Sequence, residues 1–290
     1  MTRGERLRGY AFVAPIVAAF AAVAFAPIAI AAWLSLRRRV LVFHEDAFVG
    51  LANYATLVHD ARFLSALGNT AYFTVVSVAI ELLVGLPIAL LLQRTFPGRG
   101  LVRAAVLVPW ALPSVVSARM WAWLFNPDYG IVVRLLPEGD RDVLGMPVAA
   151  MHAAIVADVW KSTPFVVLLL LAGLTAIPEE LHRAARVDGA RPWRIFTSIT
   201  LPLLRPAILV TALFRGLDAL RVFDTIFVLT GGGPASTTET LSIYAYKTMM
   251  NAGDFGYGST VAFATFVLVA VVSAIYLSTI GRSAVVGEAR

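Results

Sequence analysis

The segment "RVDGARPWRIFTSITLPLLRP", Arg186–Pro206, lies between two long apolar stretches of the chain. It carries four arginines and an aspartate, and three prolines and one glycine interrupt it. Glycine and proline are the residues that most often mark turns and helix ends. Together with the charges, they predict a compact, water-exposed pair of short helices that joins two membrane-spanning helices.

The composition supports a membrane protein. Of 290 residues, 59% are hydrophobic and only 14% are charged, whereas soluble domains average about 25% charged residues. The sequence contains no cysteine, which excludes disulfides and cysteine-based metal or redox sites. The arginines are scattered between apolar stretches and form no basic face, so the net charge of +6 reflects membrane topology and not nucleic-acid binding.

The long apolar stretches predict an all-α polytopic membrane protein with about six transmembrane helices in a single domain, residues 1–290. A bilayer-spanning helix needs about 20 mostly apolar residues. The first stretch is too long for a signal peptide and lacks a clear cleavage site, so it is predicted to be retained. The expected spans are 10–36, 67–92, 104–125 (kinked at its prolines), 148–172, 206–230 and 259–281.

The distribution of lysine and arginine predicts the orientation. The loops on the side of the N-terminus carry most of the basic residues, including Arg3, Arg6 and Arg8 and the arginines of the opening segment. Residues 37–39, three consecutive arginines, argue the other way. The whole-chain bias favours a multi-pass protein of the bacterial plasma membrane with both termini in the cytoplasm.

The opening segment also has local helix signals. Pro178, followed by two glutamates, suits the start of a helix, because the helix dipole favours acidic residues there. Gly189 is placed to end that helix in a left-handed conformation. Pro192 then begins a second short helix, which "LPLLRP" is expected to stop. A polar connector would not need this construction, so a docking element for another protein is the favoured interpretation.

The longer segment "AARVDGARPWRIFTSITLPLL" resembles the EAA loop of binding-protein-dependent ABC importers. The expected loop spans about 176–205. Arg183 stands where that family's pattern has glutamate, which is a departure. By this resemblance, the residues that would contact an ATPase are Arg183, Ala184, Ala185, Asp188, Gly189, Ala190, Trp193 and Phe196.

Two further stretches extend the resemblance. "FVGLANYATLVHDARFLSALGNTAYFT" and "VLTGGGPASTTETLSIYAYKTMM" are similar to segments of maltose and glycerol-3-phosphate type permeases, and finer details are similar to the first permease subunit of trehalose importers. The resemblance implies the type I importer permease (MetI-like) fold. It also implies a heterodimer with a second permease subunit, two ATPase subunits, an extracytoplasmic sugar-binding protein, contact with membrane lipid and no nucleic acid. The cargo implied is a sugar, such as the disaccharide trehalose.

The same resemblance implies that this chain is not itself an enzyme. It has no G-x-x-x-x-G-K-[ST] motif, because the glycine run "TGGGPAS" lacks the lysine. ATP and Mg would therefore be held by the partner ATPase subunits, with no cofactor bound by this chain. Its four histidines are widely separated and have no ligand-like spacing, so no metal site is expected.

Ionisable residues inside the predicted spans are the candidates for a substrate pathway, because such groups usually face protein or a watery cavity. The fifth expected span alternates charge every three residues at Arg215, Asp218, Arg221 and Asp224, and Glu81 lies in the second. These charges could hold helices in register or contact substrate, and both interpretations stay open. Carried over from the maltose importer by position, the pathway residues are Asp158, Lys161, Ser162, Phe165, Arg215, Asp218, Ala219 and Val222.

Three alternatives remain. The chain could be a permease for another sugar or a sugar phosphate. It could be a proton-driven secondary transporter that uses Asp158, Glu81 or Asp218, although no inverted repeat is evident. An intramembrane protease with Asp158 and Asp218 as its dyad is disfavoured, because neighbouring cations would keep both carboxylates ionised.

Overall fold

The computed structural model describes residues 3–287 and is mostly helical. Five helical segments are long and apolar enough to cross a membrane, and a bent pair of helices makes a sixth candidate. The five unbroken segments are Phe12–Ser35 in α1 (Arg3–Ser35), α3 (Ala61–Gln93), α6 (Pro147–Thr175), Pro192–Ala219 and Phe255–Ser278 in α12 (Phe255–Gly287). These agree closely with the expected first, second, fourth and sixth spans.

The expected third span is a sharply bent pair. Helix α4 (Arg99–Ala111) and helix α5 (Ser114–Leu124) meet at 93°. Leu112, the first of the two residues between them, is extended with ψ 138°, because the ring of the following Pro113 disfavours the helical conformation. The expected kink is therefore a near right-angle turn.

The expected boundary at "LPLLRP" is wrong. Helix α8 (Pro192–Ile195) passes through a π-helical turn, Phe196–Thr200, directly into α9 (Leu201–Ala219). The backbone N–H of Leu201 bonds to the carbonyl of Phe196, and this wider turn lets the chain continue where Pro202 has no N–H to donate. One candidate span of 28 residues results.

The expected end of the fifth span, at residue 230, is also wrong. Helix α9 ends at Ala219, and the N–H groups of Arg221 and Val222 bond to the carbonyls three residues earlier. Such bonds tighten the last turn of a helix. Helix α10 (Asp224–Leu229) then begins with Asp224 in its first turn, where the helix dipole favours an acid. Asp224 therefore does not continue the charge pattern of α9.

The described residues form two compact units, one of residues 3–64 and 244–267 and the other of residues 65–243 and 268–287. The first unit contains the only strands of the described chain, β1 (Arg37–Val40) and β2 (Glu45–Phe48), which pair antiparallel with Arg37 opposite Phe48. No pattern in the sequence predicted this hairpin. This unit also contains α1, α2 (Ala52–Leu57), the first residues of α3, the end of α11 (Leu241–Tyr246), a π-helical turn, Lys247–Asn251, and the start of α12.

Within the first unit, glycine permits a close backbone approach. A Cβ on Gly256 would lie 2.1 Å from the carbonyl oxygen of Arg37, so only glycine fits there. The hydroxyl of Thr260 also donates to the carbonyl of Ser35 at 3.2 Å. The start of α12 is therefore held against the end of α1 and the beginning of the hairpin.

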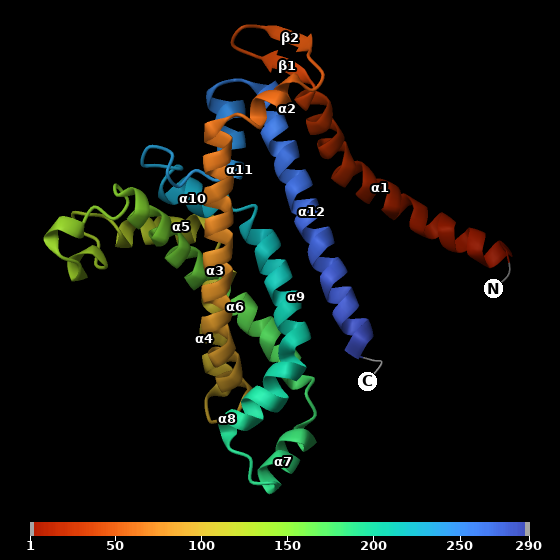
Figure 1. Ribbon diagram of the computed structural model, residues 1–290, viewed down its shortest axis with the longest axis vertical. Coiled ribbons are helices and arrows are strands. Elements are labelled where there is room, and N and C mark those ends of the chain that lie inside the picture. Colours follow the sequence, from red (N-terminus) through yellow and green to blue (C-terminus); the bar gives the residue numbers. More distant parts are fainter. Residues whose placement is uncertain (1–2, 288–290) are drawn as a thin grey trace. The chain divides into compact units, whose positions relative to one another are not determined.

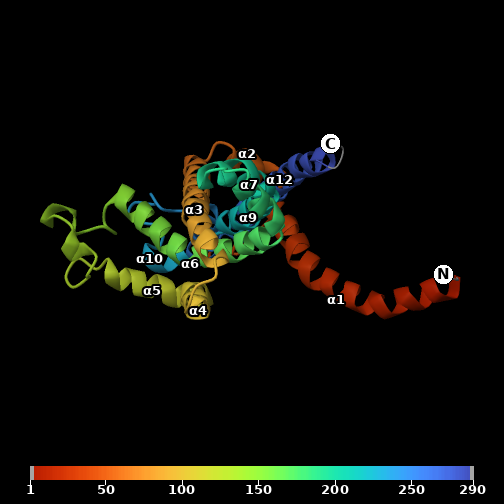
Figure 2. The same cartoon turned by 90° about the horizontal axis from the view of Figure 1, so that it is seen from below.

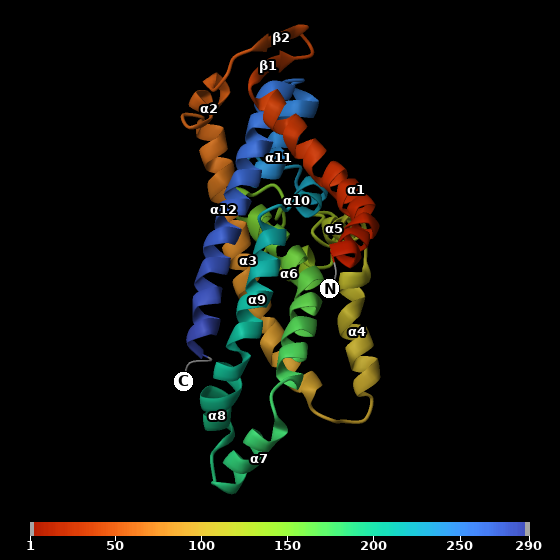
Figure 3. The same ribbon diagram turned by 90° about the vertical axis from the view of Figure 1, so that its right-hand side faces the viewer.

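In the second unit, α6 is the central helix. It contacts α4, α5, α9 and α10, and Figures 2 and 3 show it among these helices. A Cβ on Gly173 of α6 would lie 2.4 Å from Cβ of Ala207 on α9. Small residues at such positions let membrane helices approach closely.

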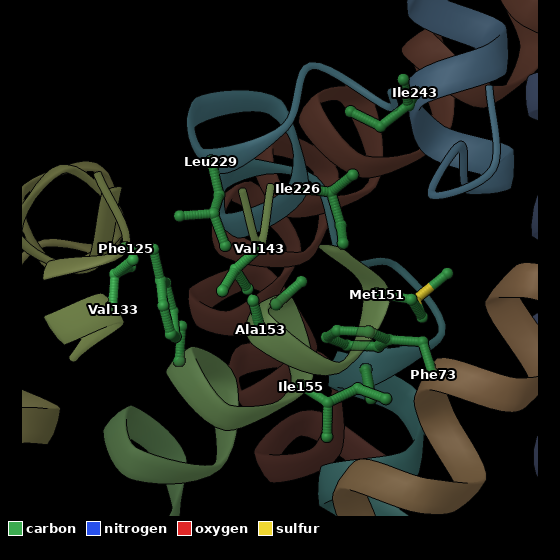
Figure 4. Packing of buried hydrophobic residues seen from close by; sticks show 13 residues of the cluster. Phe73, Phe125, Val133, Val143, Met151, Ala153, Ile155, Ile226, Leu229 and Ile243 are labelled. Atoms are coloured by element: carbon green, nitrogen blue, oxygen red, sulfur yellow. The ribbon is translucent and has the colours of Figure 1, made fainter. Parts of the chain in front are cut away.

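A hydrophobic cluster fills the part of this unit around the first half of α6. Figure 4 shows Phe73 of α3 beside Met151 and Ile155 of α6, with Ile226 of α10 nearby. Phe73 and Ile226 are fully buried. The cluster also takes residues from α5 and from the following loop, which contains two short 3₁₀ turns, Val133–Leu135 and Glu138–Asp140.

Candidate functional site

A buried arginine joins three helices of the second unit. The side chain of Arg215, on α9, is 3% exposed, and its Nε and Nη2 groups donate to the two carboxylate oxygens of Glu81 on α3 at 2.6 and 2.7 Å. Glu81 is fully buried. Parallel, two-bonded contacts of this kind are the strongest ion-pair geometry available to arginine. Two charges that would each be costly inside a membrane thus neutralise one another.

Two aspartates complete the arginine's contacts. Nη2 of Arg215 also donates to Asp158 on α6 at 3.0 Å, and Nη1 donates to Asp218, one turn along α9, at 2.5 Å. The side chain of Asp158 is 11% exposed, while that of Asp218 is 70% exposed. One guanidinium therefore binds both aspartates, which is unlike the facing pair of carboxylates that an aspartic protease needs.

Asp158 and Asp218 line a hollow between α6 and the end of α9. One part has a volume of about 170 Å³ and extends to α10, and an adjoining part of about 300 Å³ reaches α4. Lys161, Ser162, Asp218 and Arg221 line both parts. We refer to the two parts together as the α6–α9 hollow.

The α6–α9 hollow combines charged and hydroxyl groups with aromatic surface. The rings of Trp110 on α4 and Phe165 on α6 are stacked with their centroids 5.8 Å apart, and both line the hollow. Lys161 is half-buried and has no carboxylate within 4.0 Å among the described residues. The hollow therefore offers an ammonium donor, carboxylate acceptors and a flat apolar face.

All eight residues proposed for the substrate pathway line this hollow, although they come from two segments that are far apart in the sequence. They are Asp158, Lys161, Ser162, Phe165, Arg215, Asp218, Ala219 and Val222. Five other lining residues were not predicted from the sequence: Trp110, Ser114, Phe214, Phe223 and Thr225. Trp110 and Ser114 flank the break in "PWALPS", and the two prolines of that stretch were the available indication that the chain turns there.

The segment proposed to contact an ATPase forms a helical elbow, which we define as residues 179–200. Helix α7 (Glu179–Val187) is followed by Asp188 and then by Gly189, whose φ is +74°. The N–H of Ala190 bonds to the carbonyl of Ala185 at 2.9 Å, and that of Gly189 to Arg186 at 3.1 Å. These two bonds define a Schellman motif, the helix ending that requires a left-handed residue. The predicted glycine corner is confirmed.

Several side chains of the elbow project into open surroundings. Val187 is 87% exposed and Trp193 is 73% exposed, and the Trp193 ring lies 5.7 Å from that of Phe196. Arg183, which replaces the family's glutamate, pairs with Glu179 one turn earlier at 3.5 Å. His182 of α7 contacts the hydroxyl of Thr200 at 3.0 Å and so connects the two arms of the elbow. Figure 1 shows these arms as α7 and α8.

A second polar cluster lies in the first unit, where Asp60 and Tyr244 are outside the candidate membrane spans and Tyr257 is in the first turn of α12. The hydroxyls of Tyr244 and Tyr257 both donate to the same carboxylate oxygen of Asp60. Burial raises the pKa of Asp60, but these two bonds and the N–H groups of the next residues outweigh it, so its pKa lies below the ordinary value of 3.8. Burial, with the bond to Asp60, raises the pKa of Tyr244 to about 12.

No group of three or more potential metal ligands occurs among residues 3–287. Two of the carboxylates that line the α6–α9 hollow, Asp158 and Asp218, instead accept hydrogen bonds from Arg215.

The comparisons with known proteins identify the class. The sequence profile of the family "binding-protein-dependent transport system inner membrane component" matches residues 81–280. The fold agrees with a solved bacterial ABC transporter involved in the import of the acidic polysaccharide alginate. That structure has a TM-score of 0.81 and 22% identity, and the match covers 96% of each chain.

Two curated relatives are similar over nearly their whole length. The trehalose/maltose transport system permease protein MalF of Thermococcus litoralis is 43% identical over 281 residues, which cover 96% of this chain and 95% of the relative. The trehalose transport system permease protein SugA of Mycobacterium tuberculosis is 43% identical over 285 residues, covering 98% and 92%. This chain belongs to the binding-protein-dependent family: it is a multi-pass inner-membrane permease subunit of an ABC importer, and not the ATPase.

Proposed function

We propose that this permease forms half of the pathway for a sugar, a disaccharide such as trehalose, and that the α6–α9 hollow is its contact site. The observation that carries the proposal is the lining of that hollow, where Lys161 and Asp218 lie beside the stacked rings of Trp110 and Phe165. Sugars present hydroxyls to charged groups and C–H faces to aromatic rings. The names of the 43% identical relatives support the same class of substrate.

The proposed complex contains a second permease subunit, two ATPase subunits that bind ATP and Mg, and an external sugar-binding protein. The elbow, residues 179–200, would dock on an ATPase subunit through its exposed Val187 and Trp193. Since α8 continues into α9 without a break, a displacement of the elbow would be transmitted to the helix that carries Arg215 and Asp218. This continuity supports a mechanical coupling between ATP hydrolysis and the hollow.

The central experiment is sugar-stimulated ATP hydrolysis by the assembled complex with its binding protein, using trehalose, maltose and glucose as test sugars. Stimulation by a disaccharide is the expected result. A complex that no sugar stimulates would contradict the proposed substrate class. Sugar uptake by this chain alone into liposomes with a proton gradient would instead favour a secondary transporter.

The proposed orientation places both termini and the elbow in the cytoplasm. The natural chain has no cysteine, so single cysteines can be introduced without background labelling. Gly139→Cys lies in an open position, with nothing within 4 Å of its Cβ, and should react with a membrane-impermeant maleimide on intact cells. Arg194→Cys in the elbow should react only after the membrane is permeabilised, and the reverse pattern would refute the topology.

A further inference from the structure

Glu81 contributes a charge to the site without lining it. It is fully buried on α3 and is absent from the lining of the α6–α9 hollow. Glu81 accepts two hydrogen bonds from Arg215, at 2.6 and 2.7 Å, whereas Asp158 and Asp218 accept one each, at 3.0 and 2.5 Å. Because Glu81 is also fully buried while the side chain of Asp218 is 70% exposed, Glu81 is the principal buried counter-charge of an arginine that does line the hollow.

Glu81 and the two aspartates take up most of the hydrogen-bond donors of Arg215. A guanidinium has five N–H donors. Two bond to Glu81, one to Asp158 and one to Asp218, which leaves one hydrogen on Nη1. Arg215 thus presents a single hydrogen-bond donor to the hollow, and the rest of its donors are held by carboxylates.

The charged side chains that line the hollow have a net charge of zero, and Glu81 makes the local net charge negative. Three lining residues are carboxylates and three are cations, namely Asp158, Asp218 and Asp224 with Lys161, Arg215 and Arg221. Glu81 adds one negative charge directly behind this lining. A ligand in the hollow therefore meets hydrogen-bonding groups in a field that is neutral to slightly negative, which disfavours an anion.

We propose that Glu81 is a specificity-determining positioning residue: by neutralising Arg215 from behind, it makes the hollow accept neutral sugars and reject anionic ones. The inference rests on the proposed function of the hollow as a sugar pathway. Without the charge of Glu81, the positive charge of Arg215 would be only partly neutralised. The aspartates that line the hollow also have Lys161 and Arg221 to neutralise. An acidic sugar would then bind better, while a neutral sugar would be little affected.

The test uses two probes that differ in one group, maltitol with a terminal CH₂OH and maltobionate with a carboxylate in its place. Each is titrated as an inhibitor of the ATPase activity of the complex, stimulated by trehalose and the binding protein. The same binding-protein preparation serves every variant, so its own preference contributes equally throughout. The measured quantity is the inhibition constant of maltobionate divided by that of maltitol.

Glu81→Gln keeps the shape of the side chain and removes its charge. We expect the ratio to fall by about tenfold, the order of magnitude for one unit charge acting across a partly screened site. Glu81→Asp keeps the charge and should keep the wild-type ratio. The matched control is Ser77→Ala, one turn away on α3, where a fully buried hydroxyl has no hydrogen-bond partner in the described structure.

If Glu81→Gln does not assemble, a second variant tests whether Glu81 neutralises Arg215. Glu81→Gln combined with Arg215→Gln removes a pair whose charges cancel, so the ratio should stay at the wild-type value. A severalfold rise in the ratio would show that Arg215 attracts anions in the native protein, and would overturn the proposal. An unchanged ratio in assembled Glu81→Gln, or equal behaviour of Glu81→Asp and Glu81→Gln, would overturn it as well.

Failure of the proposed function gives a different result. If no sugar stimulates or inhibits the wild-type complex, the hollow is not a sugar pathway. If the wild-type complex responds to sugars and the ratio is insensitive to the charge at position 81, only the role of Glu81 is refuted.

Discussion

Gly189 offers the sharpest test of the elbow. Its φ of +74° lies in the left-handed region, and a Cβ added there would meet no atom within 4 Å. A substitution therefore introduces no clash, and its whole effect comes from backbone conformation. An L-residue in this region costs about 1–2 kcal/mol, with asparagine less penalised. A β-branched side chain belongs at the upper end of this range, because positive φ is a genuine outlier for such residues.

We expect Gly189→Val to lower coupled sugar transport by roughly tenfold or more, since about 1.4 kcal/mol corresponds to a factor of ten in an equilibrium. Gly189→Ala should have a smaller effect, and Gly189→Asn should stay near the wild-type level. The order of the series follows from φ alone. The amount of protein in the membrane should be nearly unchanged, because the Cβ is unobstructed.

The assay is uptake of radiolabelled trehalose in cells, with basal and sugar-stimulated ATP hydrolysis of the purified complex. Gly100→Val is the matched control, because Gly100 lies within helix α4 and a Cβ there also meets nothing within 4 Å. Normal transport by Gly189→Val would refute the reasoning that the left-handed corner positions the elbow. Equal losses in Gly189→Val and Gly100→Val would show that the defect is not specific to the corner.

Four further outcomes are expected. Arg215→Met should abolish assembly, judged by size-exclusion yield, because removing one partner of a buried ion pair costs about 3–5 kcal/mol; Asp218→Asn, at a 70% exposed side chain, should assemble and lose sugar-stimulated ATPase activity. Gly173→Val should lower the thermal stability by about 1–3 kcal/mol through overpacking against Ala207, 2.4 Å from the new Cβ, and a wild-type melting temperature would contradict this contact. The lowered pKa of Asp60 means that its carboxylate stabilises the fold above its ordinary pKa of 3.8 and that this contribution is lost as the pH falls through the folded value; melting curves of Asp60→Asn should therefore depend less on pH in acid than those of the native chain.

Much of the fold followed from local patterns. Apolar length predicted four of the spans with an error of at most six residues at either end, because a membrane-crossing helix satisfies all its backbone hydrogen bonds internally and needs no partner to be recognised. The corner at Gly189 was also predictable, since a Schellman ending depends on a residue that tolerates positive φ. Both features are properties of one segment of the chain.

The predicted helix boundaries were wrong where local sequence signals and the packing of the chain favoured different structures. Pro202 and Pro206 indicated a helix end, yet the π-helical turn at Phe196–Thr200 accommodates them within one continuous helix. Conversely, the apolar run beyond Ala219 indicated a longer helix, yet the chain turns there and begins α10. The hairpin of β1 and β2 had no distinct pattern in the sequence, since its four-residue strands are rich in charge.

By itself, the sequence determined that the chain crosses a membrane several times, that a polar elbow separates two of the crossings, and that ionisable groups lie within the crossings. Only the tertiary structure decided which of these groups meet. Glu81 and Arg215 are 134 positions apart, and helical periodicity fixes the face on which each lies but not the helix opposite. That choice depends on close contacts such as those of Gly85 with Val166 and Gly173 with Ala207, which bring three helices near enough for one arginine to bind three carboxylates.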